Sequence, residues 1–101
     1  MKTRLLMRLR RKAKKYVTIE VERDGCLIIK NTGWRRECYF CNDDTFRGLW
    51  YFSYNEVTQF DNIDEATEKL SIARRKYIIA EVKNILRKKD IQQKLKLVKR
   101  L

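Results

Sequence analysis

The stretch YVTIEVERDGCLIIKN, residues 16–31, decides the fold because the hydrophobic period of the chain changes there from helical to extended. Val17, Ile19 and Val21 alternate with polar residues, which is typical of a strand with one buried face. The Asp-Gly pair in its middle predicts a two-residue hairpin turn. The return strand is CLIIKN. This stretch therefore predicts an antiparallel hairpin.

Two more strands are predicted downstream of the hairpin. WRRECYFC (34–41) is expected to be a third strand and FRGLWYFSY (46–54) a fourth, with NDD as the turn between them. Gly48 within the fourth strand indicates a bulge or a close backbone approach. Strands joined by such short connections are antiparallel neighbours. We therefore expect a meander of three or four strands.

A long helix is predicted to begin in FDNIDEATEKL, residues 60–70. Asn62 or Asp61 can cap it, and Glu65 follows Asn62 by three residues, as in a capping box. A helix that reaches about Lys89 would be roughly 40 Å long, so its second half would project beyond a small sheet. Its apolar residues form a first stripe and a second, drifted one: Ile63, Ala66, Leu70, Ala73 and Tyr77, then Ile78, Val82, Ile85 and Leu86.

Short basic amphipathic helices are expected at both ends. Thr3 can cap the first, whose apolar residues Leu5, Leu6, Leu9, Ala13 and Tyr16 recur at helical spacing. Asp90 and Gln93 repeat the capping pattern before the last one, whose apolar residues are Ile91, Leu95, Val98 and Leu101. The predicted fold class is α+β, a small antiparallel meander covered by one long C-terminal helix. Its parts are an arm (1–15), a core domain (16–89) and a tail (90–101).

Positive charge is concentrated at the two ends of the chain. The 101 residues carry 25 Lys or Arg against 13 Asp or Glu, a formal net charge of +12. Residues 1–15 hold eight basic and no acidic groups, residues 16–73 hold six and eleven, and residues 74–101 hold eleven and two. A nucleic acid, an anionic membrane or an acidic protein could each attract such ends. The ends are therefore the predicted binding elements.

Length and composition narrow the class of protein. A chain of 101 residues supports one domain with a modest core. It has no run of about 18 apolar residues that would span a membrane, and LLMRL is too short for a secretory segment. Three cysteines are an odd and small set for a secreted disulfide scaffold, so reduced thiols are expected.

The CYFC motif is the one pattern that suggests a metal or redox site. Cys38 and Cys41 could clamp zinc, but only Cys26 is available as a third thiol, and a fourth ligand would have to be Asp43, Asp44 or a second copy. We favour packed thiols over zinc and over a redox pair. The absence of histidine removes the commonest general base, and no glycine-rich phosphate loop is present. We predict a non-enzyme with no catalytic residue, no metal and no cofactor.

The binding residues follow from the charge pattern. An acidic protein surface is the preferred partner, because docking would use the leucines of the arm as well as its cations. Nucleic acid is the alternative partner, with Trp34, Arg35, Arg36 and Arg47 as further contacts. The aromatic residues of this region are, however, expected mainly to pack in the core. An anionic membrane under the first helix is the least favoured partner. The predicted partner-binding residues are Arg4, Leu5, Leu6, Arg8, Leu9, Arg10, Arg11, Lys12, Lys14, Lys15, Arg87, Lys88, Lys89, Lys96, Lys99 and Arg100.

Two resemblances accompany this interpretation. The meander followed by FDNIDEATEKL and a basic helix, about residues 34–80, resembles the sheet-plus-helix layout of AP2-type DNA-binding domains. MKTRLLMRLRRKAKKY with a Lys-rich end is similar to small basic auxiliary capsid proteins of crAss-like tailed phages. The second resemblance implies a protein without an active site, present in many copies between capsomers and bound to acidic capsid faces by its ends. It implies a virion location; the nucleic-acid alternative implies a cytoplasmic, nucleoid-associated one.

Overall fold

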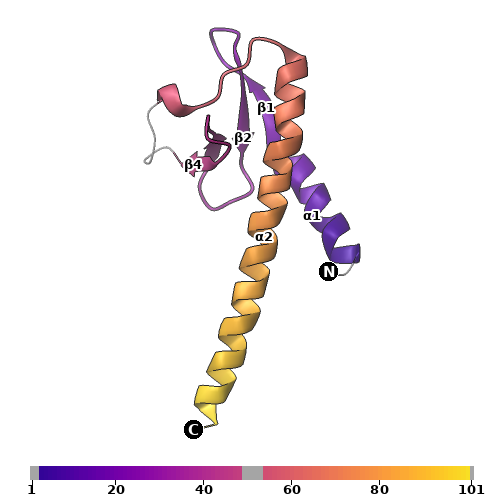
Figure 1. Cartoon of the computed structure of the whole chain (residues 1–101), viewed down its shortest axis with the longest axis vertical. Coiled ribbons are helices and arrows are strands. Elements are labelled where there is room, and N and C mark those ends of the chain that lie inside the picture. The colour runs from indigo at the N-terminus through magenta and orange to yellow at the C-terminus, as the bar shows by residue number, and fades with distance from the viewer. Residues whose placement is uncertain (1–2, 49–53, 101) are drawn as a thin grey trace.

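The computed structural model of the chain describes residues 3–48 and 54–100. Its strands form a single antiparallel sheet in the order β1-β2-β3-β4, which confirms the predicted meander and the α+β class. The long C-terminal helix runs along the sheet, and the N-terminal helix leads directly into the first strand (Figure 1). In chain order the elements are α1 (Thr3–Tyr16), β1 (Val17–Val21), β2 (Leu27–Asn31), β3 (Cys38–Phe40), β4 (Phe46–Gly48), the short 3₁₀ helix η1 (Tyr54–Glu56) and α2 (Ile63–Lys99).

The β1–β2 hairpin closes through three residues, 23–25, so the predicted two-residue turn is wrong by one residue. The amide of Gly25 donates to the Glu22 carbonyl (2.9 Å), and the Glu22 amide donates to the Cys26 carbonyl (2.8 Å). Gly25 has φ = 86°, a conformation that glycine adopts without a steric penalty. A turn followed by one such residue is the usual three-residue hairpin, and it places Val21 opposite Leu27.

The third and fourth strands are shorter than predicted. β3 begins at Cys38 rather than at residue 34, because the preceding loop leaves the sheet to pack Trp34 against α2. In β4, Gly48 pairs in regular register with Cys38, so the expected bulge is absent from the described strand. The predicted fourth strand also included residues 49–53, which lie outside the described residues, and the chain is already helical at Tyr54.

The core lies between the sheet and the first half of α2. The Asn62 side chain accepts a hydrogen bond from the Glu65 amide (2.9 Å), which confirms the predicted N-cap. Ala66, Ala73 and Tyr77 of α2 are fully buried, and the two alanines let the helix approach the sheet closely. Ile63 was expected in this stripe but is 57% exposed at the start of the helix. The buried cluster also contains Ala13, Val17, Ile29, Phe40 and Phe60.

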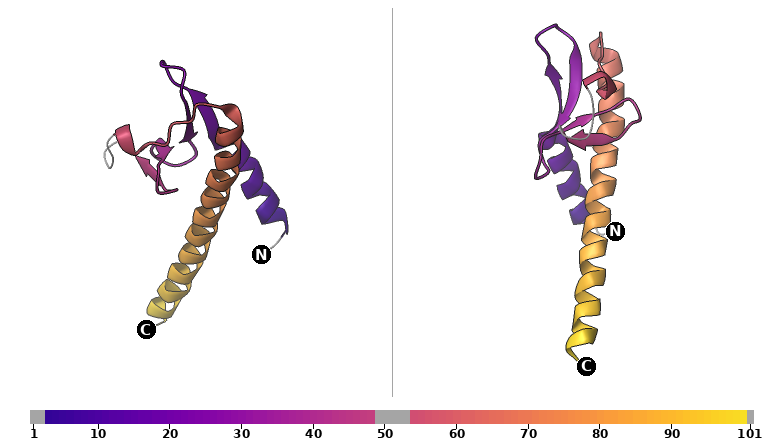
Figure 2. Two further views of the ribbon diagram at one scale, coloured as in Figure 1. Left: turned by 45° about the horizontal axis from the view of Figure 1, so that its top comes forward. Right: turned by 90° about the vertical axis from the view of Figure 1, so that its left-hand side faces the viewer.

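The helix α2 is continuous to Lys99, so the predicted break before Asp90 and the separate terminal helix are wrong. The segment around Asp90 contains no Gly or Pro and is rich in good helix formers, which a cap signal alone does not interrupt. Asp90 instead forms an ion pair with Lys94 one turn later (3.2 Å). At 1.5 Å per residue α2 is about 55 Å long, close to the 60 Å length of the whole molecule. Its last part extends beyond the sheet (Figure 2).

Candidate partner-binding surface

The helix α1 is amphipathic and uses its apolar side for the fold. Leu9 and Ala13 are buried, at 2% and 1% exposure, and Leu5 and Leu6 are half-buried. Leu9 was predicted to contact a partner, but its side chain is used inside the molecule and is not part of the accessible surface. Leu5 and Leu6 remain partly accessible near the start of the helix. The exposed residues of α1 are Thr3, Met7, which is 48% exposed, and the seven cations Arg4, Arg8, Arg10, Arg11, Lys12, Lys14 and Lys15.

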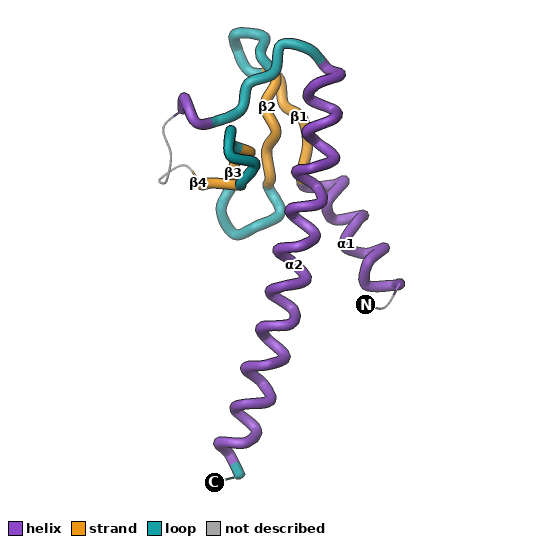
Figure 3. Tube along the Cα trace, in the orientation of Figure 1, coloured by secondary structure: helices purple, strands orange, loops and turns teal. Residues whose placement is uncertain are grey.

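The end of α1 is fixed where the chain passes into β1 without a loop (Figure 3). Arg74 of α2 donates from Nε to the Val17 carbonyl (3.1 Å) and from Nη2 to the Lys14 carbonyl (3.4 Å). A cation at this position also opposes the negative end of the helix dipole. Desolvation lowers the pKa of Arg74. The Thr32 amide donates to the Tyr16 carbonyl (3.0 Å), so the helix is held from both sides of the junction.

A groove runs between α1 and α2, and we call it the α1–α2 groove. The two helices lie side by side where α1 ends and diverge toward the N-terminus, as both Figure 1 and the left view of Figure 2 show. The groove has a volume of about 500 Å³. Its lining combines aliphatic side chains with cations and contains no acidic residue: Leu6, Arg10, Ala13, Lys14, Thr67, Leu70, Ser71, Arg74, Arg75, Ile78 and Ile79.

Residues 86–100, which we call the α2 extension, are all exposed. Ile91, Leu95 and Val98 recur at helical spacing on one side and are 45%, 53% and 63% exposed. Leu86 and Leu97 are also exposed, at 60% and 61%. The predicted contact residues of this region are on the surface with them: Arg87, Lys88, Lys89, Lys96, Lys99 and Arg100. The α2 extension therefore presents aliphatic and cationic side chains together.

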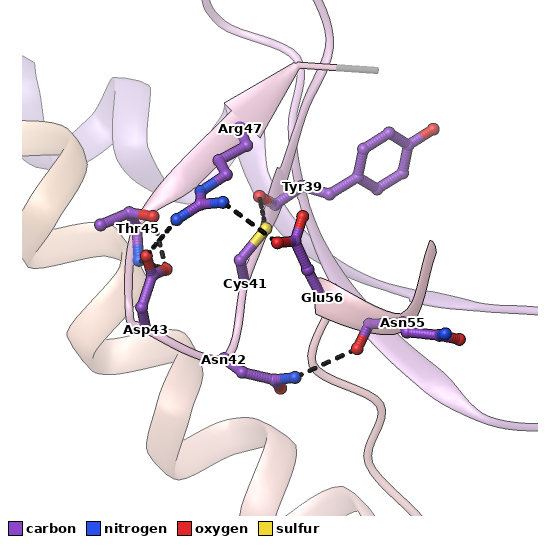
Figure 4. A network of polar contacts seen from close by, with 8 residues as sticks. All are labelled: Tyr39, Cys41, Asn42, Asp43, Thr45, Arg47, Asn55 and Glu56. Atoms are coloured by element: carbon purple, nitrogen blue, oxygen red, sulfur yellow. Dashed lines mark hydrogen bonds and ion pairs between the residues drawn. The ribbon is translucent and has the colours of Figure 1, made fainter. Parts of the chain in front are cut away.

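Arg47, a predicted nucleic-acid contact, is engaged within the chain (Figure 4). Its guanidinium pairs with Asp43 (2.5 Å) and with Glu56 (3.5 Å). The hydrogen bond with Asp43 raises the pKa of Arg47. The Thr45 hydroxyl (2.6 Å), and then Arg47, hold the pKa of Asp43 below its usual value. Asp43, Arg47 and Glu56 line a cavity of about 230 Å³. Two carboxylates face one guanidinium there, so the site does not attract phosphate.

Trp34 is likewise used inside the molecule. Its ring stacks on Tyr77 (centroids 5.7 Å apart, planes at 15°) and meets Phe46 edge-on (5.4 Å). The indole Nε1 donates to Glu81 of α2 (2.9 Å). Arg35 and Arg36 are exposed on the loop that follows. The four residues predicted for nucleic acid are therefore not assembled into one patch, since Trp34 and Arg47 point to intramolecular partners.

The three cysteines are free thiols. Cys41 is buried, and Cys26 and Cys38 are half-buried. Desolvation raises the pKa of all three thiols, which disfavours the thiolate needed for metal binding or nucleophilic attack. Within residues 3–48 and 54–100, no group of three or more His, Cys, Asp or Glu side chains is arranged to hold a metal ion. In the same part of the chain, no helix is both long and apolar enough to cross a bilayer.

Sequence reasoning missed the α1–α2 groove and the role of Arg74. The available signal was the second apolar stripe of α2, which begins at Ile78. A sheet that packs on the first stripe leaves this second stripe uncovered. The position of Arg74 had no local signal, because its acceptors lie 57 and 60 residues away in the sequence.

No protein-family model matches the chain, and no curated protein or solved structure is significantly similar to it. The resemblances to AP2-type domains and to auxiliary capsid proteins stay predictions.

Proposed function

We propose that the protein is a non-enzymatic assembly protein that docks on an acidic protein surface through α1 and the α2 extension. The observation that carries this proposal is the composition of the α2 extension. It exposes five large aliphatic side chains among seven cations and a single acidic residue, Asp90. Within the described residues it is not covered by any other element of the chain.

The exposed aliphatic side chains favour a protein partner over nucleic acid. Phosphate contacts require cations alone, because the free energy comes largely from counterion release. A protein interface takes most of its binding energy from buried side chains, while peripheral charges mainly steer association. Burying what is now exposed of Ile91, Leu95 and Val98 would contribute roughly 1 kcal/mol each. The cations around them select an acidic surface.

The setting suggested by the compositional resemblance is a virion. In it, the protein would be an auxiliary capsid or other virion component, repeated in many copies against acidic subunits. The alternative function is DNA or RNA binding, which is favoured by the exposure of the cations on both helices and of Arg35 and Arg36. That alternative would place the protein in the cytoplasm, on the nucleoid.

A salt series separates the two functions. Binding to a short random-sequence DNA duplex is measured by fluorescence anisotropy from about 0.05 to 0.2 M salt. Our proposal predicts that affinity is lost at the upper end, as for generic attraction of a +12 protein. Micromolar affinity at about 0.2 M, with a log-log slope of about −4 or steeper, would overturn it in favour of nucleic acid.

Two matched variants refine the same experiment. Lys96→Ser/Lys99→Ser removes two charges, and Leu95→Ser/Val98→Ser removes two aliphatic side chains from the same turns of helix. On DNA only the lysine variant should weaken binding. On the physiological partner both should weaken it, the aliphatic variant by at least as much. An aliphatic variant that binds the partner as wild type would contradict the proposal.

A further inference from the structure

The α1–α2 groove has an aliphatic floor supplied by both helices. Leu6 comes from α1, and Leu70 and Ile78 come from α2. These three side chains are half-buried, and Ile79 beside them is 45% exposed. The floor is therefore accessible from the open side of the groove.

The same face of α2 stays aliphatic beyond the groove. Val82 and Ile85 follow Ile78 at spacings of four and three residues and are half-buried, and Leu86 beside them is 60% exposed. From Leu70 to Leu86 this seam is about 24 Å long at 1.5 Å per residue. The ribbons of α1 and α2 diverge in this direction (Figure 2, left), and the residues that line the groove end at Ile79.

The rim of the groove is positively charged. Arg10 and Lys14 contribute from α1, and Arg74 and Arg75 from α2. In the described part of the chain none of the four forms an ion pair, and Arg74 uses its donors on backbone carbonyls. An aliphatic floor between cationic rims is complementary to an occupant with an apolar stripe and acidic flanks.

We propose that the α1–α2 groove binds an amphipathic helix of about 16 residues, with acidic flanks, from a partner protein. This inference rests on the proposed function and specifies its partner. A helix suits the site because both walls are helices whose apolar side chains recur every three or four residues, so a third helix can pack its own stripe between them. Its length follows from the 24 Å seam. Its carboxylates would pair with Arg10 and Lys14 on one side and Arg75 on the other.

Other occupants fit less well. A second copy of the chain has one acidic helical stretch, the start of α2, but there Ile63 is the one large aliphatic side chain exposed in residues 61–69. A net charge of +12 also opposes association of two copies. Nucleic acid would leave the aliphatic floor unused. A bilayer surface is broad and cannot enter a groove between two helices.

The test uses the full chain and a synthetic 16-residue helical peptide that has Leu at positions i, i+4, i+7 and i+11 and Glu on both flanks. Binding is measured by fluorescence anisotropy at about 0.15 M salt. We expect micromolar dissociation constants, and no measurable binding of a peptide with the same composition in which the Leu residues are spread around the helix. Equal binding of the two peptides would overturn the proposal, because it would show generic charge attraction.

Variants locate the binding site. Arg10→Glu/Arg75→Glu should weaken peptide binding at least tenfold, and a peptide with Lys flanks should restore it. Arg35→Glu/Arg36→Glu makes the same change of charge on a loop outside the groove and should change binding less than twofold. Ile79→Glu places a carboxylate on the accessible floor and should also weaken binding tenfold. Circular dichroism melting confirms that each variant is folded.

The outcomes separate this proposal from the proposed function. If the groove variants bind the peptide as wild type while Leu95→Ser/Val98→Ser binds it less, the groove is not the site and docking through the α2 extension stands. If neither peptide binds and the DNA duplex binds at about 0.2 M salt, both proposals are wrong.

Discussion

The two parts of α2 carry similar apolar spacings and have opposite surroundings. Residues 63–85 bury Ala66, Ala73 and Tyr77 against the sheet, whereas in residues 86–100 the corresponding side of the helix leaves Leu95 and Val98 more than half exposed. The charge differs as well, with five basic and four acidic residues in the first part and seven and one in the second. The comparison shows that an amphipathic pattern alone does not say what buries the apolar side of a helix. The charges beside that apolar side distinguish a face that packs on the protein's own sheet from one that is available to an acidic partner.

The largest predicted effect is a difference in the free energy of unfolding between two variants, one in each part of α2. Tyr77→Ala should lower the free energy of unfolding by about 3–5 kcal/mol, because it empties a buried site and removes the ring stacked on Trp34. Leu95→Ala should change it by less than about 0.5 kcal/mol. Urea unfolding measures both. A comparable loss in Leu95→Ala would show that the α2 extension is packed in the free protein.

The next effect concerns how α1 is fixed beside the packed part of α2. In Gly33→Ala the added Cβ would lie 2.8 Å from the Tyr16 Cβ, an atom close to the backbone that cannot move aside easily. We expect a loss of about 1–3 kcal/mol in the free energy of unfolding. Gly25→Ala meets no atom within 4 Å and should cost about 1 kcal/mol through its positive φ alone. A Gly33→Ala protein as stable as wild type would show that this contact is loose.

A smaller effect is expected at the cap of α1. Arg74→Met keeps the length of the side chain but removes its hydrogen bonds to the Val17 and Lys14 carbonyls, which should cost about 1 kcal/mol. Arg75→Met, on the exposed next position, should be nearly neutral. Thermal unfolding compares the pair. Equal melting temperatures in the two variants would argue that the carbonyls are satisfied without Arg74.

The smallest effect is a pH dependence in the turn between β3 and β4. The pKa of Asp43 is below its usual value, so the unfolded chain binds this proton more readily and the carboxylate stabilises the fold. That contribution is present above the usual Asp pKa of about 4 and is lost as the pH falls through the lower folded value. Asp43→Asn should therefore melt below wild type at pH 6, and the difference should shrink toward pH 2. If the difference in melting temperature persisted at pH 2, it would contradict the assignment of this stabilisation to the ionised carboxylate of Asp43.

Local signals in the sequence predicted local structure well. The alternation from Val17 predicted the hairpin. The helix cap was predicted at Asn62 or Asp61, and the structure uses Asn62, because capping involves residues three positions apart. The misses depend on distant residues. The third strand is shortened because Trp34 bonds to Glu81, 47 residues later. On α1, the helical spacing alone does not distinguish Leu9, which is buried, from Leu5 and Leu6, which are half-buried. The cations of the candidate surface were predicted from the distribution of charge along the chain. The α1–α2 groove could not be predicted in this way, because it depends on how the two helices lie relative to each other.

Native-state amide hydrogen exchange along α2, measured on the free full-length chain, tests the central claim most directly. If the first part of the helix holds the fold and the α2 extension is left for a partner, amides around residues 70–82 should be protected to the level of global unfolding. Amides in residues 88–98 should exchange by local fraying, many times faster. Uniform protection along the whole helix would contradict the account, because it would mean that the α2 extension is already covered in the free protein.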